Sequence, residues 1–270
     1  MSATPASQAT MPSEPIEQTH ADLPVIEVWK KALMLPVNYA PTLIRIGWAP
    51  ALISFAVMAG VRLLTFEGII GRGGSFWLYL IVAIVFTPFS VGWTQLAING
   101  QDSVARRAPF TFGRTELFYL LAMIAQQLVW VLLVLPALLV YYAQQNFEPT
   151  LMFDGVILLL ALFIAIVIGM TRTLYIFPAL AVGRYQGIGA AWRQSRCSFE
   201  RLLTLELLAR APWAILIALL SGSVFDWSPL AAQLTVTVFV SILAVLEEAT
   251  SVGAIALAWR WRIGESGQSK

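Results

Sequence analysis

The chain has 270 residues, of which 59% are hydrophobic and 12% are charged, with a formal net charge of +2 and a mean hydropathy of +0.76. A soluble domain carries roughly 25% charged residues, so this composition excludes a water-soluble globular protein. An integral membrane protein is the class that remains.

The first 22 residues form a polar segment that is rich in Ser, Thr, Pro, Gln and Glu and contains no Lys or Arg. This composition predicts a disordered tail over residues 1–22. The segment also lacks the basic start and apolar core of a secretory signal. We therefore expect the first membrane span to direct the chain into the membrane.

Six apolar blocks follow the tail, and each is long enough to cross the ~30 Å hydrocarbon core as a helix. Strands of membrane barrels run only about 9–11 residues and alternate polar with apolar positions, a pattern that residues 156–170 lack. The sequence predicts an all-α, polytopic bundle of about six spans within residues 23–262, and a flexible tail over 263–270. The predicted spans are 43–65, 75–98, 117–142, 155–182, 202–225 and 231–259.

The basic residues predict the orientation of the chain in the membrane. Twelve of the 17 lie beside one set of block ends, whereas the opposite loops contain only Arg72. Cytoplasmic loops carry the excess of Lys and Arg, so we expect both termini in the cytoplasm. These arginines need no nucleic-acid partner to explain them. The twelve are Lys30, Lys31, Arg106, Arg107, Arg114, Arg184, Arg193, Arg196, Arg201, Arg260, Arg262 and Lys270.

Two segments ahead of spans, near residues 24–37 and 187–201, are predicted as amphipathic interfacial helices. Each places a tryptophan on the apolar face and basic residues on the polar face, a pattern typical of helices in the headgroup plane. Anionic headgroups on the cytoplasmic side are therefore the expected partners. The alternative is a cytoplasmic extension of the following span. The residues concerned are Trp29, Lys30 and Lys31 in the first segment and Trp192, Arg193 and Arg196 in the second.

The same two segments indicate an internal repeat, because WKK at 29–31 and WRQ at 192–194 occupy like positions ahead of the first and fifth spans. The repeating unit would be a surface helix followed by a transmembrane hairpin, used three times in parallel. Residues 103–114 would be a degraded middle copy.

Residues 171–208 resemble a known family. They contain TR at 171–172, FPALAV at 177–182, GAAWRQS at 189–195 and FERLL at 199–203. These motifs resemble a family of six-span bacterial proteins related to the membrane domain of some glycerophosphodiester phosphodiesterases. Family members often have an acidic residue where this chain has Gly183. The resemblance implies a bacterial inner-membrane location and no settled biochemical role. It does not imply phosphodiesterase activity, because the metal-binding catalytic domain is missing from this sequence.

Histidine and cysteine are too scarce for most site chemistry. The single histidine, His20, lies in the predicted tail, and the single cysteine, Cys197, lies in the second interfacial segment. A metal site built from these ligands and a Ser-His-Asp triad are both excluded within one chain. We therefore expect no enzymatic activity, no metal and no cofactor.

Ionisable residues inside spans are the candidate functional residues, because such groups are costly in hydrocarbon. We expect them to form one polar layer in the cytoplasmic half of the bundle. Within one helix, Glu206 and Arg210 can pair at i,i+4 spacing. Arg172 has no acidic neighbour in its own span, so we expect it to pair with Glu247 or Glu248. The candidate layer contains Gln126, Arg172, Glu206, Arg210, Glu247 and Glu248.

Stripes of small and polar residues predict which helix faces point inward. The second span has Ala83, Thr87, Ser90, Thr94 and Ala97; the fourth has Ala161, Ala165, Gly169 and Arg172; the sixth has Thr237, Ser241, Ala244, Glu248 and Ser251.

Two functions remain open. The first is a non-catalytic accessory or organising membrane protein in which the polar layer joins the helices. The second is a carrier or channel for a small solute, ion or lipid that uses the intramembrane charges. We favour the first because the broken helix pairs of transporters are not evident. Protein partners and self-association are left open.

Overall fold

The computed structural model describes residues 23–66, 76–105, 107–108, 110–129, 149–196, 198–222 and 229–268. Within these residues the regular elements are helices and no strand occurs, which confirms the predicted all-α fold. Five of the helices are long and apolar enough to cross a membrane. The chain is therefore a multi-pass integral membrane protein.

Most helices follow the predicted spans closely, but the predicted span over 155–182 is divided into two helices at residues 174–175. The helices are α1 (Val25–Asn38), α2 (Ala40–Phe66), α3 (Phe76–Asn99), the short 3-10 helix η1 (Gln101–Ser103), a helix over residues 114–129, α5 (Pro149–Thr173), α6 (Ile176–Ala181), α7 (Ile188–Ser195), α8 (Phe199–Gly222) and α9 (Leu230–Gln268). The third predicted span begins in the helix over 114–129, but residues 130–142 lie outside the described residues, so the count of six stays a prediction. The predicted tail over 1–22 also lies outside them.

Helix α9 differs from its predicted boundaries. It has 39 residues and is therefore about 58 Å long at 1.5 Å per residue, which exceeds the hydrocarbon core. No proline interrupts its C-terminal part, so the helix continues to Gln268. Residues 263–268, predicted as part of a flexible tail, are helical.

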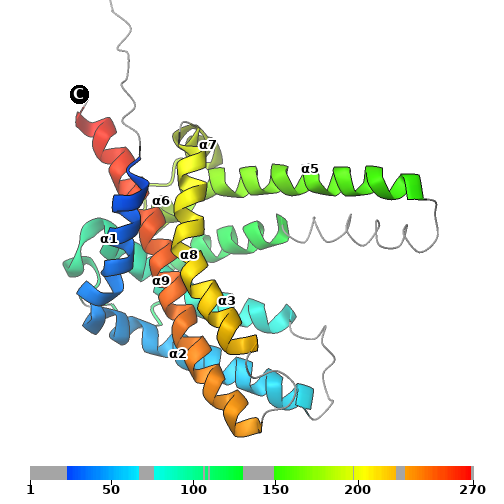
Figure 1. The fold of residues 1–270 in the computed structure, drawn as a ribbon. Coiled ribbons are helices and arrows are strands. Elements are labelled where there is room, and N and C mark those ends of the chain that lie inside the picture. Colours follow the sequence, from blue (N-terminus) through cyan, green and yellow to red (C-terminus); the bar gives the residue numbers. More distant parts are fainter. Residues whose placement is uncertain are drawn as a thin grey trace, which may run out of the picture.

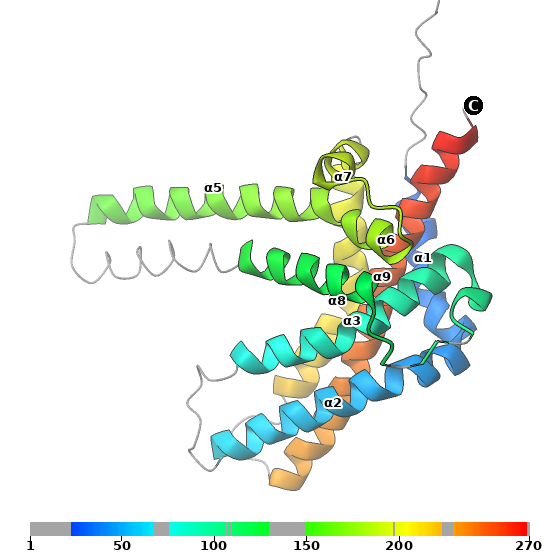
Figure 2. The same ribbon diagram turned by 180° about the vertical axis from the view of Figure 1, so that it is seen from behind.

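Three helical hairpins diverge from a common base (Figures 1 and 2). They are the pair α2 and α3, the pair formed by the 114–129 helix and α5, and the pair α8 and α9. Helix α9 contacts α1, α2, α3, α6 and α8 and is the centre of the assembly. The hairpin that contains α5 projects away from the other two, and α5 contacts α7 and α8 near the base.

Helix α3 packs tightly against α9. Phe89 and Trp93 are stacked with ring centroids 6.0 Å apart, and both side chains are almost fully buried. The indole Nε1 of Trp93 donates a hydrogen bond to the carbonyl oxygen of Ala249 in α9 at 2.8 Å. The predicted inward stripe of α3 is confirmed, since Thr87, Ser90 and Thr94 are at most 1% exposed.

The first predicted interfacial helix, α1, packs against protein. Its apolar residues Val28 and Ala32 are buried, and the helix contacts α8 and α9. Trp29 Nε1 donates a hydrogen bond to the carbonyl oxygen of Leu208 in α8 at 2.9 Å. Pro212, four residues later, has no N–H to reach that carbonyl, so the tryptophan supplies the missing donor.

The exposed side of α1 carries Lys30 and Lys31 together with Ile26, Met34 and Val37. This side has the composition expected of a helix at a lipid headgroup layer. Placement of α1 in the headgroup plane stays a prediction.

The second predicted interfacial helix is the short α7, which contacts α5. Ser195 is fully buried and its Oγ donates a hydrogen bond to the carbonyl oxygen of Arg172 at 3.0 Å. That carbonyl lies in the last turn of α5, where helix carbonyls lack intrahelical partners. Trp192, Arg193 and Arg196 are exposed.

The segments that precede the three hairpins each contact a different hairpin. Helix α1 packs on α8 and α9, and α7 packs on α5. The connection after η1 contacts the first hairpin, because Arg45 of α2 donates hydrogen bonds to the carbonyl oxygens of Val104 and Ala105 at 2.6 and 2.5 Å. Each segment thus joins the hairpin that it precedes to a neighbouring one, in the cyclic order expected of three parallel repeats.

A candidate ionic site around Arg210

Helix α8 supplies the centre of an ionic cluster. Glu206 and Arg210 are one turn apart, so both side chains lie on the same face. Arg210 Nε donates a hydrogen bond to Glu206 Oε1 at 2.5 Å. The pairing expected from i,i+4 spacing is therefore present.

Helix α9 adds two more carboxylates to the same guanidinium. Arg210 Nη1 lies 3.3 Å from Glu247 Oε1, and Arg210 Nη2 lies 4.0 Å from Glu248 Oε2. The guanidinium is a planar group with five N–H donors, so it can serve two helices at once. Arg210 thereby joins α8 to α9.

Two serine hydroxyl groups also contact the carboxylates of the cluster. Ser90 of α3 donates a hydrogen bond to Glu248 Oε1 at 2.7 Å, and Ser251 of α9 lies 3.1 Å from both carboxylate oxygens of Glu206. Because Ser90 belongs to α3, the cluster extends over three helices.

Tyr119 is a buried side chain that lies within electrostatic range of the cluster. It is 3% exposed, its hydroxyl interacts with the Thr94 side chain, and Glu248, Arg210 and Glu206 all act on it electrostatically. Tyr119 belongs to the helix over 114–129, which brings the second hairpin to the site.

The cluster carries more negative than positive groups. Three carboxylates surround one guanidinium, so the four side chains sum to −2 when all are ionised. The Glu206, Glu247 and Glu248 side chains are 17–22% exposed, and that of Arg210 is 43% exposed. Uncompensated charges at membrane depth are costly.

Arg172 takes a different position from the one predicted. Its guanidinium carbon lies 4.9 Å from the ring centroid of Trp192 and 5.8 Å from that of Phe199. Within the described residues it forms no ion pair with Glu247 or Glu248, and its Nε is buried without a hydrogen-bond partner. The predicted pairing is wrong because α5 ends beside α7, where two aromatic faces receive the cation instead.

The remaining predicted member of the layer, Gln126, lies on the helix over 114–129 and is half-buried. Among the described residues, no hydrogen bond joins it to the cluster. The structure therefore brings together four of the six predicted residues: Glu206, Arg210, Glu247 and Glu248.

Sequence reasoning missed a second ion pair at the base of the bundle. Arg107 pairs with Glu116, which is 4% exposed, and Arg107 Nη1 also donates a hydrogen bond to Gln95 Oε1 at 2.9 Å. Glu116 Oε2 accepts from the backbone N–H of Gly113 at 2.8 Å. A glutamate at the third position of a helix often accepts a hydrogen bond from the backbone N–H of the N-cap residue. The spacing of Gly113 and Glu116 in the sequence therefore could have predicted this hydrogen bond.

Gly92 makes room for that pair. A Cβ atom at this position would lie 3.2 Å from the Cδ and Nε atoms of Arg107. A side chain at residue 92 would therefore push the guanidinium away from Gln95 and Glu116, which shows that the glycine serves close packing rather than backbone freedom.

The two ionic sites are the Arg210 cluster and the pair of Arg107 and Glu116. Within the described residues, no group of three or more His, Cys, Asp and Glu side chains is placed to hold a metal ion. The carboxylates around Arg210 can exchange protons, and their hydroxyl partners can reorient as they do so.

Comparisons with known proteins identify no relative. No protein family, no curated protein and no solved structure matches the chain.

Proposed function

We propose that this chain is a non-catalytic protein of the bacterial inner membrane, an accessory or organising factor, in which the Arg210 cluster holds α3, α8 and α9 in one arrangement. The observation that carries the proposal is the convergence of Glu206, Glu247 and Glu248 on a single guanidinium. Removal of Arg210 leaves three carboxylates without their shared cation, so the cluster favours one set of helix positions over alternatives.

The orientation in this proposal places the base of the bundle in the cytoplasm. The base contains α1, η1, α7 and the C-terminal part of α9. Five of the twelve basic residues on the predicted cytoplasmic side lie on these helices, and they are Lys30, Lys31, Arg193, Arg260 and Arg262. The positive-inside rule supports this orientation, as does the resemblance of residues 171–208 to an inner-membrane family.

A double-mutant cycle tests the organising role. Arg210→Leu should lower the free energy of unfolding by roughly 1.5–3 kcal/mol, the range for hydrogen bonds to charged groups. The pair Arg210→Leu/Glu247→Leu should lose less than the sum of its single variants, because the second change removes a carboxylate left without a partner. Unfolding of the full chain in detergent measures both effects.

Arg193→Leu is the matched control, because Arg193 is exposed on α7 and surface changes are usually within about 0.5 kcal/mol. Strict additivity in the cycle, or an equal loss in the control, would contradict the organising role of the cluster.

One observation favours a second candidate, a proton or cation carrier. Three carboxylates face one guanidinium, so the site has an excess of negative charge that favours a proton or a cation. Purified protein in vesicles with an internal pH-sensitive or cation-sensitive dye tests this function. A flux that Glu247→Gln and Glu248→Gln abolish at unchanged melting temperature would establish the carrier; the absence of flux from the unaltered protein would exclude it for these ions.

A further inference from the structure

A pocket with a basic wall lies between α1, the end of α3 and α9, apart from the Arg210 cluster. It has a volume of about 400 Å³. The described residues of its wall combine basic with apolar side chains and include no aspartate or glutamate. The basic residues are Lys30 and Lys31 of α1 and Arg260 of α9, and the apolar ones include Met34, Leu96 and Leu257.

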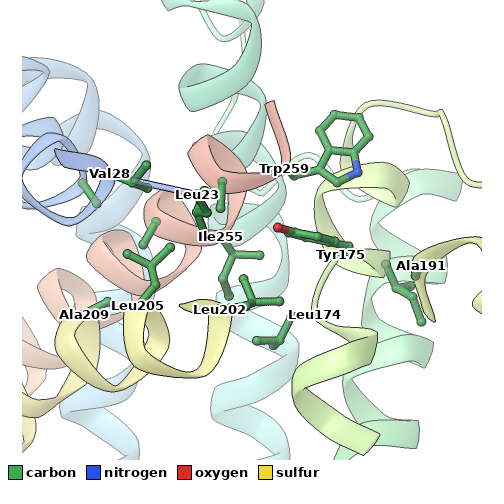
Figure 3. Packing of buried hydrophobic residues seen from close by; sticks show 14 of the residues in the cluster. Leu23, Val28, Leu174, Tyr175, Ala191, Leu202, Leu205, Ala209, Ile255 and Trp259 are labelled. Atoms are coloured by element: carbon green, nitrogen blue, oxygen red, sulfur yellow. The ribbon is translucent and has the colours of Figure 1, made fainter. Parts of the chain in front are cut away.

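Packing of α1 on α9 brings these basic residues together, although they come from opposite ends of the sequence. Val28 of α1 and Ile255 of α9 belong to one cluster of buried apolar residues (Figure 3). Leu35 of α1 belongs to a second cluster, together with Ala256 of α9. The two helices are therefore held against each other at two points along α1, and the basic side of α1 is fixed beside the C-terminal part of α9.

The three basic side chains have no carboxylate partner within the described part of the chain. All three are exposed, so a ligand from outside can reach them. Arg260 Nη1 donates a hydrogen bond to the carbonyl oxygen of Ala97 at 3.5 Å, in the last turn of α3, where carbonyls lack intrahelical partners. A guanidinium has five N–H donors, so this contact directs Arg260 toward the pocket and leaves donors for a ligand.

The apolar part of the wall favours a lipid over a free anion. Met34 is 56% exposed, whereas Leu96 is 2% exposed and forms part of the floor. Val37, one turn after Met34, is 69% exposed and continues the apolar surface along α1. An inorganic anion gains nothing from apolar surface, but a phospholipid has an anionic phosphate next to acyl chains that favour such contacts.

We propose that this pocket binds the headgroup of one anionic phospholipid, with Lys30, Lys31 and Arg260 contacting the phosphate and Met34 contacting the start of an acyl chain. The volume lies in the lower range of small-molecule pockets, which fits a headgroup and leaves the acyl chains outside. Basic pockets beside transmembrane helices on the cytoplasmic side are places where anionic headgroups bind.

This binding differs from general attraction of α1 to a membrane surface, because Arg260 belongs to another helix. The headgroup would join α1 to α9 from outside the core, so its binding should stabilise the folded protein. The inference shares with the proposed function the placement of the base at the membrane surface, but it uses no residue of the Arg210 cluster. A failed Arg210 double-mutant cycle would therefore leave it intact.

The test uses the full chain in an uncharged detergent. Native mass spectrometry counts the lipids that the protein retains, comparing phosphatidylglycerol with phosphatidylcholine of the same acyl chains. One phosphatidylglycerol per chain should be retained in preference to phosphatidylcholine. Melting curves with each lipid and with inorganic phosphate form the second arm, and phosphatidylglycerol should raise the melting temperature most.

Two variants remove one charge each from the pocket. Lys31→Gln and Arg260→Gln should each weaken phosphatidylglycerol retention about fivefold, which corresponds to about 1 kcal/mol per basic residue near an anionic headgroup. Arg193→Gln is the matched control, because it removes the same charge from an exposed position on α7, outside the pocket. It should weaken retention less than twofold.

A third variant fills the pocket and keeps every charge. Asn38 lines the pocket and is the exposed last residue of α1, so Asn38→Trp places a large ring where the headgroup would lie. Retention should fall at least fivefold in Asn38→Trp and less than twofold in Asn38→Ala. General attraction between a basic surface and anionic lipid would not distinguish these two variants.

Four results would overturn the proposal. They are equal retention of the two lipids, equal losses in Arg193→Gln and Arg260→Gln, equal retention in Asn38→Trp and Asn38→Ala, and a melting temperature raised as much by inorganic phosphate as by phosphatidylglycerol. The last result would assign the pocket to a free anion instead of a lipid. Melting curves of the variants without added lipid verify that each is folded.

Discussion

Helices α3 and α5 are both apolar enough to cross a membrane, yet the protein uses them in opposite ways. In α3, 61% of the most apolar stretch is buried inside the protein, whereas in α5 the share is 17%. Helix α3 contacts α2, α6 and α9, but α5 contacts α7 and α8 near the base of the bundle. A membrane span can therefore be either a core element or an arm, depending on how many neighbours it has along its length.

The two helices also use their small residues differently. The stripe of α3 faces the interior, and its Ser90 reaches the ionic cluster. The predicted inward stripe of α5 is wrong for Ala161 and Ala165, which are exposed. Small residues permit a second helix to approach closely, but their presence alone does not predict that a second helix packs there.

Truncation of a leucine should give the largest difference between the two helices. Leu96→Ala in α3 should cost about 2–5 kcal/mol of unfolding free energy, because Leu96 is 2% exposed and its loss leaves a cavity. Leu158→Ala in α5 is the matched control, since Leu158 is 65% exposed, and should stay within about 0.5 kcal/mol. Denaturant titrations in detergent measure both; a similar cost at both positions would mean that α5 is as well covered as α3.

Enlargement of an alanine should give the next largest difference. Ala97→Leu in α3 should destabilise by about 1–3 kcal/mol, because Ala97 is 5% exposed and a larger side chain overpacks the interface. Ala165→Leu in α5 should be nearly neutral, since Ala165 is exposed. If Ala165→Leu destabilises the protein in a bilayer but not in detergent, a second protein or a second copy of this chain covers that face in the membrane.

Substitutions that weaken the contact between α5 and α7 at the base should give the smallest loss of stability. Trp192→Leu should lower stability by about 0.5–2 kcal/mol, because it removes the aromatic face above Arg172. Trp192→Phe keeps an aromatic face and should lose less. Hydrogen exchange of the last turn of α5 is the direct measurement; unchanged exchange in Trp192→Leu would show that Ser195, and not the cation–π contact, holds α5 to α7.

The ionic cluster divides into a part that sequence could predict and a part that it could not. Glu206 and Arg210 pair within one helix, and i,i+4 spacing predicts that contact directly. Glu247 and Glu248 were expected at the same depth as the cluster, but their partner is Arg210 rather than Arg172. Depth follows from counting residues along a helix, whereas the choice between two arginines depends on which helices are neighbours.

Tyr119 and Glu116 show the same division. Both lie near the start of the helix over 114–129, and their side chains are buried. Glu116 follows Gly113 at the spacing of a helix N-terminal cap, which is local information. Tyr119 carries no such local signal, because its role depends on the approach of Thr94 and Glu248 from other helices.

The sequence by itself determined the all-α fold, the membrane class and the approximate bounds of most spans, because these depend on hydropathy and on the fixed rise of the helix. It also determined which residues share a helix face. The tertiary structure decided which of those faces are covered, which arginine meets Glu247 and Glu248, and that Trp29 donates to the carbonyl of Leu208. Apolar helices in lipid gain little from burial against each other, so their partners are chosen by side-chain packing and polar contacts between segments that are distant in the sequence.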